Sequence, residues 1–317
     1  MSRQARVTDL NGIYHIVIHE SKSKPLFPSE SDKEMMMEKI RESQIKYQFK
    51  IYAYCLMDTH AHFIIDSNGE EISTIMKSIG LRYVKYYNPK YDTNGPLLKE
   101  RFFSELINTD EYLLKASLYI HANPKDIFGY SEMPETYRFS SMRCYLGNED
   151  EFGILDTDFI LSILSINSRY AVESYVKLFK HTLIQKVSHF KELDLSTTLT
   201  INNRKIEIKI NDKKFGITRR ILKRNFDVEQ IIDFVEKETG ITRSSFLTKA
   251  DHGVKTPKAL FILLTGIYTE KTTYEIGHIL EDMSIEEVNA LSNEGIYLVL
   301  HEDKYKNIIE KFYSENK

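Results

Sequence analysis

The sequence is poor in cysteine and has no hydrophobic run long enough to cross a membrane. Its two cysteines, Cys55 and Cys144, are too few for a disulfide framework or a thiolate metal cluster, so we expect both to be reduced. A bilayer span needs about 18 to 20 apolar residues in a row. Residues 1–10 are polar and charged, unlike the start of a signal peptide. We therefore expect a cytoplasmic protein with no membrane partner.

A strong excess of positive charge is also missing. The formal net charge is -3, whereas a domain devoted to phosphate contacts is usually basic. The segment from Arg204 to Arg224 differs, because nine basic residues there accompany two acidic ones. It is either a DNA-binding segment or a solvated hairpin, since 205–210 alternates charged and apolar residues. The candidate DNA contacts in this basic block are Lys213, Lys214, Arg219 and Arg220.

The length of 317 residues predicts about two domains. Hydrophobic periodicity in the first half predicts strands at 13–18, 49–57, 60–66 and 101–107, and helices at 32–45, 71–87 and 110–123. We expect Asp110 to be the N-cap of the last of these helices. The order β-α-β-β-α-β-α predicts an α+β fold, with an antiparallel sheet and helices on one face.

A domain boundary is expected near residue 148, where Gly147 and Asn148 stand among acidic residues. This divides the chain into an α+β domain over 1–148, a helical and basic linker region over 149–225, and a helical domain over 226–317. The periodicity of the second half predicts helices at 158–166, 171–179, 228–239, 257–267, 273–280 and 304–312.

The first pattern that carries chemistry is His60-Ala61-His62. Residues two apart on a strand point to the same face, so both imidazoles could bind one divalent ion. Taken alone, the motif is weak evidence for a metal site, because two histidines on the solvent-exposed face of a strand give the same pattern.

The second pattern lies on the helix at 110–123. Tyr112, Lys115, Tyr119 and Asn123 are three, four and four residues apart and share one face. A tyrosine hydroxyl attacks phosphorus only if its developing charge is offset, which a divalent cation or Lys115 could do. The alternative is that Tyr119 is an amphipathic core residue, one of 20 tyrosines.

Four separated motifs resemble the single-tyrosine HUH transposases, and in particular their REP-associated branch. They are YCLMDTHAHF at 54–63, Arg101-Phe102, YIHANP at 119–124, and Phe139-Ser140-Ser141 with Tyr145. The resemblance runs from about residue 13 to residue 146. This chain departs from the usual family pattern ahead of the first histidine, before Arg101 and at Phe139, and none of these departures removes a catalytic group.

The resemblance implies a ferredoxin-like HUH domain that binds single-stranded DNA, often as a hairpin, and nicks and rejoins it during DNA transposition and recombination. It implies that His60 and His62 bind Mg²⁺ or Mn²⁺ and that Asn123 completes the metal site. Tyr119 would be the nucleophile and would form a 5′-phosphotyrosine intermediate. The active site could belong to a monomer or be shared in a homodimer.

DNA contacts outside the basic block are expected from the helix at 71–87 and from its surroundings. Cations and aromatics alternate there, an arrangement that suits stacking on unpaired bases. We expect Tyr83 and Tyr87 to point inward. The expected DNA-binding residues are Arg82, Lys85, Tyr86, Arg101 and Lys115.

The segment 227–312 resembles the helix-turn-helix domain of bacterial replication initiators, with 272–280 as the helix that would read DNA. Glu275, Glu281 and Asp282 make that helix poorly suited to phosphates, so a helical interaction domain is an equal alternative. For the whole chain, the first alternative to a transposase is a domesticated DNA-binding regulator with little cleavage activity. The second is a zinc hydrolase, for which Asp58 and Asp66 are the candidate acidic ligands.

Overall fold

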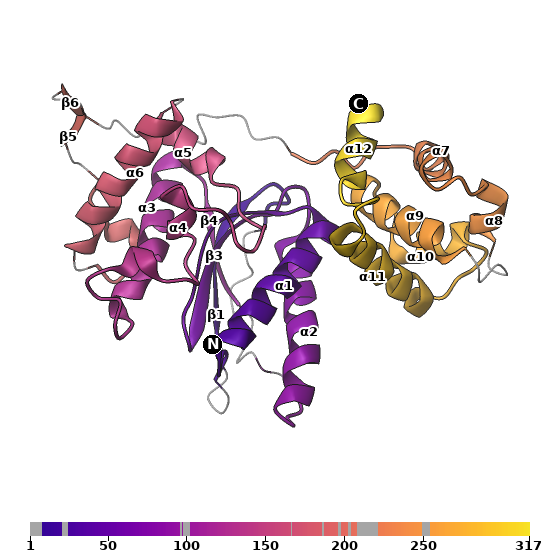
Figure 1. Cartoon of the computed structure of the whole chain (residues 1–317), viewed down its shortest axis with the longest axis horizontal. Coiled ribbons are helices and arrows are strands. Elements are labelled where there is room, and N and C mark those ends of the chain that lie inside the picture. Colours follow the sequence, from indigo (N-terminus) through magenta and orange to yellow (C-terminus); the bar gives the residue numbers. More distant parts are fainter. Residues whose placement is uncertain are drawn as a thin grey trace. The chain divides into compact units, whose positions relative to one another are not determined.

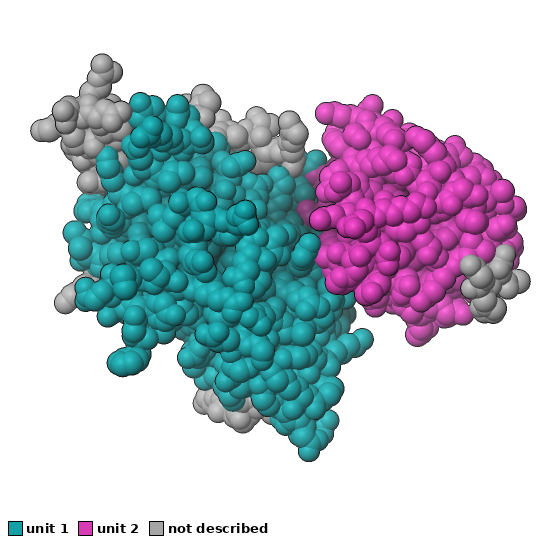
Figure 2. All heavy atoms as spheres, in the orientation of Figure 1, with its two compact units in different colours: residues 1–44, 49–221 teal, residues 45–48, 222–317 magenta. Residues whose placement is uncertain are grey.

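The computed structural model describes residues 8–20, 25–95, 97, 102–165, 167–185, 187–195, 198–201, 204–207, 221–248 and 254–317, with the backbone alone for 198–201 and 204–207. The chain forms two compact units (Figure 2). Unit 1 comprises Met1–Gln44 and Phe49–Ile221, and unit 2 comprises Ile45–Gln48 and Leu222–Lys317. Residues 149–221, which the sequence assigned to a linker region, thus belong to unit 1.

Unit 1 is built on a four-stranded sheet in the order β2-β3-β1-β4. The strands are β1 (Ile13–His19), β2 (Lys50–Leu56), β3 (His60–Asp66) and β4 (Phe103–Ile107), and every pair is antiparallel. Helix α1 (Glu30–Tyr47) connects β1 to β2, and α2 (Ile72–Lys90) connects β3 to β4. This is the ferredoxin-like arrangement, so the predicted α+β fold with an antiparallel sheet is confirmed.

Helices cover both faces of this sheet, whereas the sequence predicted helices on one face only. All residues of β1 from Ile13 to Ile18 are buried, which requires a layer on each side. Figure 1 shows α1 and α2 on one side, and α3 (Asp110–Ala122), α5 (Asp158–Leu164) and α6 (Ser168–Leu183) on the other. The Tyr175 hydroxyl of α6 bonds Ser117 of α3 at 2.9 Å. The helices after residue 148 therefore complete the layer that α3 begins.

Helix α3 starts at a different cap from the predicted one. Thr109 is extended, and its side chain accepts a hydrogen bond from the Tyr112 backbone N–H at 3.2 Å. Asp110, expected as the N-cap, is the first helical residue, where its charge favours the positive end of the helix dipole. The helix ends at Ala122 and continues as the 3₁₀ turn η1 (Asn123–Asp126), which accommodates Pro124.

The start of α1 is tied to the end of α2 by one carboxylate. Asp32 is fully buried and accepts hydrogen bonds from the backbone and hydroxyl of Ser29, from the hydroxyls of Tyr86 and Tyr91, and from the Lys90 ammonium. Burial opposes the charge on Asp32, but these donors together lower its pKa below the ordinary value. The carboxylate is thus a structural tie between two helices.

Unit 2 is helical throughout its described residues. Its helices are α7 (Val228–Thr239), α8 (Arg243–Leu247), α9 (Lys255–Tyr268), α10 (Thr273–Ile279), α11 (Ile285–His301) and α12 (Ile308–Glu315). Capping boxes begin α7, α10 and α11. Helices α9 and α11 approach closely at Gly295, where an added Cβ would lie 2.6 Å from the Ala259 carbonyl oxygen.

The remaining described elements are short. They are η2 (Pro134–Thr136), α4 (Met142–Tyr145), η3 (Phe190–Glu192), β5 (Thr198–Ile201) and β6 (Arg204–Glu207). Both cysteines are free, with Cys55 buried and Cys144 half-buried. Of the helices that are described, none is both long and apolar enough to reach across a lipid bilayer.

Candidate functional site

Four histidines lie on one face of the sheet in unit 1. In the antiparallel register of β1 and β3, His19 lies opposite His60, and Val17 opposite His62. His15 shares this face because it is two residues from Val17. The sequence predicted the pair on β3 and missed the pair on β1. The signal for it was present, since His15 and His19 are an even number of residues apart on one strand.

His62 is almost fully buried, with 7% of its surface exposed. Its Nδ1 atom lies 3.1 Å from Nε2 of His15, and its ring centroid lies 5.0 Å from that of His60. Burial, and then the neighbouring histidines, hold the pKa of His62 well below its ordinary value. The ring is therefore neutral at physiological pH, which is the form that binds metals.

His60 is more exposed than His62 and lies at the start of β3. Its Nδ1 atom lies 3.0 Å from the Thr59 hydroxyl oxygen. Its pKa is also lowered, first by burial and then by His19, whose ring stacks on it at 5.6 Å. In both His60 and His62 the nitrogen outside these hydrogen bonds is Nε2. Two neutral imidazoles with their Nδ1 atoms engaged are suited to ligation through Nε2.

Tyr119, on α3, lies beside this pair. Its ring meets the His62 ring edge-on, with 6.1 Å between the centroids. The predicted polar face of α3 is present, because Tyr112, Lys115, Tyr119 and Asn123 are all half-buried. Burial raises the Tyr119 pKa, and the charges of Asp126 and Glu192 raise it further. The hydroxyl is therefore protonated at rest.

The segment 187–195 covers the same region and was not anticipated from the sequence. The Ser188 carbonyl oxygen accepts a hydrogen bond from the Tyr119 hydroxyl at 3.4 Å. Phe190 is fully buried and packs against His15, Tyr112 and Tyr119, with 5.3, 6.1 and 6.5 Å between ring centroids. This segment therefore lies between α3 and the histidine face of the sheet.

A hydrogen bond and an ion pair anchor the segment 187–195 to the sheet. Nε2 of His189 lies 3.2 Å from a carboxylate oxygen of Glu105 on β4, and Lys191 pairs with the same carboxylate. Glu105 lies opposite His15 in the register of β4 and β1. The carboxylate of Glu105, on the histidine face of the sheet, is thus already bound by side chains of this segment.

Asn123 lies one turn after Tyr119 and lines a small cavity with it. Its Nδ2 atom donates to the Tyr119 carbonyl at 2.9 Å and to the Ile120 carbonyl at 3.3 Å. This leaves Oδ1 as the side-chain atom that could ligate a cation. The cavity measures about 60 Å³ and is lined by Tyr119, Ala122, Asn123, Lys125, Asp126, Thr182 and Val187.

Acidic metal ligands are not gathered at this site. Within the part of the chain that the structure describes, no group of three or more His, Cys, Asp or Glu side chains is arranged to hold a metal ion. Asp58 pairs with Lys33 at 2.6 Å, and Asp66 accepts a hydrogen bond from the Tyr52 hydroxyl at 2.7 Å. The candidate donors are therefore the imidazoles of His60 and His62 and the amide of Asn123, a set that would suit an open site on a phosphate better than a closed structural zinc site.

Several predicted DNA-binding residues have partners within unit 1. Arg82 pairs with Glu42 at 2.7 Å, and Lys115 pairs with Glu111 at 2.7 Å. Tyr86 donates to Asp32, whereas Lys85 is exposed. The remaining candidates lie outside the described residues, namely Arg101, Lys213, Lys214, Arg219 and Arg220.

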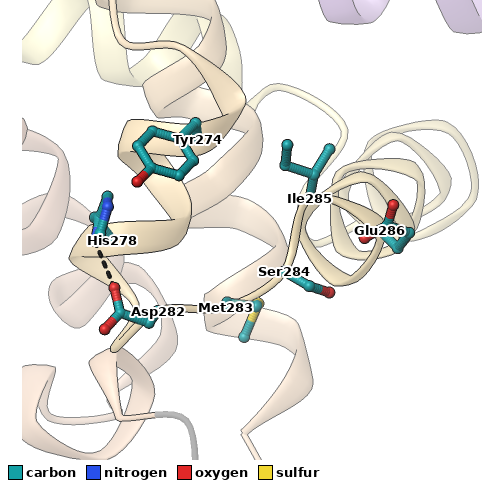
Figure 3. Close-up of a pocket in the computed structure, with 7 residues that line it drawn as sticks. All are labelled: Tyr274, His278, Asp282, Met283, Ser284, Ile285 and Glu286. Carbon is teal, nitrogen blue, oxygen red and sulfur yellow. Dashed lines mark ion pairs between the residues drawn. The ribbon is translucent and has the colours of Figure 1, made fainter.

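Unit 2 carries an open pocket of about 380 Å³ at the turn between α10 and α11 (Figure 3). Its lining residues are Tyr274, His278, Asp282, Met283, Ser284, Ile285 and Glu286. His278 forms an ion pair with Asp282. The helix predicted to read DNA at 272–280 corresponds to α10, and its acidic neighbours remain a poor match for phosphate.

Comparisons with known proteins bear on unit 1. No curated protein shows significant similarity to the sequence. A solved structure described as that of the REP-associated tyrosine transposase bound to a REP hairpin is 18% identical, covers 50% of this chain and 90% of its own, and aligns with a TM-score of 0.39. Residues 8–123, which hold the whole sheet, the histidine pair and Tyr119, match the family model described as IS200-like transposase.

Proposed function

We propose that unit 1 nicks and rejoins single-stranded, hairpin-bearing DNA as a metal-dependent transposase, with Tyr119 as the nucleophile. The observation that carries the proposal is the contact between Tyr119 and His62, inside the segment that matches the IS200-like family. The match to the family supports a role in DNA strand transfer. The histidines on the sheet and Tyr119 on α3 would be the reacting and metal-binding groups.

The histidines would hold the cation through Nε2. His60 and His62 are neutral, point from one face of β3 and have their Nδ1 atoms engaged, and Asn123 offers Oδ1 as a third ligand. A bound Mg²⁺ or Mn²⁺ would offset the negative charge that develops on the scissile phosphate.

Tyr119 performs the bond exchange. Its hydroxyl oxygen forms a bond to phosphorus while the bond from phosphorus to the 3′ oxygen breaks. The phenol loses its proton, and the departing 3′ oxygen takes one up. The products are a 5′-phosphotyrosine and a free 3′-hydroxyl, and the reverse attack joins strands without ATP.

The electrostatics of Tyr119 support the need for a cation. Burial raises its pKa, so the hydroxyl needs a positive charge nearby in order to attack. Lys115, the nearest cation along that face of α3, is already paired with Glu111. A divalent ion on the histidine pair is then the charge best placed to stabilise the phenolate.

Covalent trapping tests the proposal. The full chain is incubated with hairpin-tipped single strands from its own genomic flanks in Mn²⁺, and protein-linked DNA is resolved on a denaturing gel. A label at the 3′ end of the substrate should migrate with the protein and a 5′ label should not, because the tyrosine retains the 5′ phosphate. Fully paired duplex of the same sequence is the control. Tight binding without any adduct would instead favour a domesticated DNA-binding regulator.

A further inference from the structure

We infer that His15 is a positioning residue for His62, which it holds in the tautomer that presents Nε2 to a metal ion. The inference rests on the proposed metal site. It assigns a role to a residue of β1 that lies outside the motifs of His60, Tyr119 and Asn123.

The geometry of the pair is specific. Nε2 of His15 lies 3.1 Å from Nδ1 of His62, and the two rings stack at 14° with 5.4 Å between centroids. Their strands are neighbours, with Val17 directly opposite His62. The hydrogen bond therefore joins β1 to the metal-binding strand through side chains, in addition to the backbone ladder.

The proton arrangement follows from the ligation. A neutral histidine that binds a metal through Nε2 carries its proton on Nδ1. Nδ1 of His62 must then donate, and the nitrogen facing it, Nε2 of His15, must accept. His15 in turn carries its own proton on Nδ1. One arrangement of the two protons is thus compatible with a metal on His62.

The other ring nitrogen of His15, Nδ1, lowers the stability of the folded state. Nδ1 of His15 is buried and has no hydrogen-bond partner, and the residue is only 3% exposed. A buried polar atom without a partner destabilises a fold, and an apolar side chain of similar size would avoid that cost. The role of the other nitrogen, Nε2, explains why a histidine occupies this position despite the unsatisfied Nδ1. Nε2 accepts the hydrogen bond from His62.

The surroundings of His15 restrict its ring to this orientation. Phe190 packs edge-on against it at 84°, and Phe103 lies edge-on at 78°. With aromatic rings on these sides, the imidazole is held against His62. This restraint is what a positioning residue requires, because a ligand held in place loses less freedom on binding.

Metal affinity measured without DNA or cleavage tests the inference. Mn²⁺ binding to the full chain is followed by calorimetry for the wild type, His15→Leu and His15→Gln. Leucine cannot accept the proton, so we expect affinity to fall about tenfold to a hundredfold, as for other lost partners of metal ligands. Glutamine offers an amide oxygen near the place of Nε2 and should restore most of the affinity. Tyr14→Phe, a buried change on the opposite face of β1, is the matched control.

A second measurement needs no substitution. In wild-type protein with ¹⁵N-labelled histidine and saturating Mg²⁺, the proton of His62 should be found on Nδ1. Finding it on Nε2, or finding wild-type Mn²⁺ affinity in folded His15→Leu, would overturn the role of His15 and leave the proposed function standing. If the wild type itself binds no Mn²⁺ and no histidine resonance responds to Mg²⁺, the metal site fails, and with it both proposals.

Discussion

The ring of Tyr119 meets the ring of His62 edge-on, at 79° and with 6.1 Å between their centroids. One residue comes from a helix that lies on the sheet and the other from a central strand. Each is held by a further contact: Tyr119 by the Ser188 carbonyl and His62 by His15. A phosphate bound at the histidines would therefore lie within reach of the phenol.

Replacing Tyr119 with phenylalanine should abolish the protein–DNA adduct and leave folding and DNA binding intact. The change removes one hydroxyl that acts only in the chemical step. Adduct formation and DNA affinity are measured side by side, with Tyr112→Phe on the same face of α3 as the control. An adduct that persists in Tyr119→Phe and disappears in Tyr112→Phe would transfer the role to Tyr112.

His60→Ala and His62→Ala should each eliminate cleavage that depends on Mg²⁺ or Mn²⁺. A site with two imidazoles and one amide cannot lose a ligand and still hold the ion at working concentrations. Cleavage is followed at increasing Mn²⁺ and after treatment with a chelator. Equal cleavage by the wild type with and without chelator would rule out the metal-dependent mechanism.

Acid should destabilise unit 1 because it contains buried neutral histidines. His121 is fully buried between the Ser141 and Tyr175 hydroxyls, and burial lowers its pKa to about 3. The unfolded chain takes up a proton below its ordinary pKa of 6.5, and the folded chain does not. Stability therefore falls as the pH drops below 6.5, by up to about 1.4 kcal/mol per pH unit for each such histidine.

Urea unfolding at pH 7, 6 and 5 checks this pH dependence. His15 has a pKa lowered to about 4 and contributes with the same sign. His121→Gln should weaken the dependence, because the amide of glutamine does not take up a proton in this pH range. A midpoint that does not move between pH 7 and pH 5 would contradict burial of these histidines in the neutral form.

Arg82 and Lys85, three residues apart on α2, should respond differently to replacement by glutamine. Arg82 is paired with Glu42, so its loss should cost stability of about 0.2 to 1 kcal/mol. Lys85 is exposed, and if it contacts a phosphate its loss should lower the salt slope of DNA affinity by about 0.7 to 0.9. Thermal unfolding and salt-dependent DNA binding of both variants separate the two roles.

The basic block remains a prediction from the sequence. Replacing Lys213, Lys214, Arg219 and Arg220 together with glutamine should weaken DNA binding, and each lost contact should flatten its salt dependence by about 0.7 for single strands or 0.9 for duplex. Cleavage at saturating protein should stay near normal. Unchanged affinity and slope would show that the block is a solvated surface.

Local periodicity was enough to predict much of the fold of unit 1 and part of its site. Strand β3 and the shared face of His60 and His62 follow from the two-residue repeat, and the polar face of α3 follows from the helical repeat. His15 was missed because its place beside His62 depends on strand register, which long-range pairing determines.

Contacts between residues distant in the sequence account for other differences between the predictions and the structure. Arg82 and Tyr86 are residue types that often contact DNA, but both have partners within the fold. Arg82 bonds Glu42, 40 residues away, and Tyr86 bonds Asp32, 54 residues away. Helix α11 was not predicted, although its residues Ile285–His301 are helical in the structure. Gly295, inside this helix, allows α9 to approach.

A genetic screen for loss of activity would recover substitutions of Asp32 together with those of the proposed catalytic residues. The Asp32 carboxylate accepts hydrogen bonds from donors at the start of α1 and at the end of α2, yet none of these partners lies among His60, His62, Tyr119 and Asn123. An alanine there would leave five donors without their acceptor and release two helices at once. Mutants selected for loss of the proposed strand-transfer activity should therefore include Asp32 as readily as Tyr119. The two classes would differ in the amount of protein that accumulates in the cell, which should fall for Asp32 and hold steady for Tyr119.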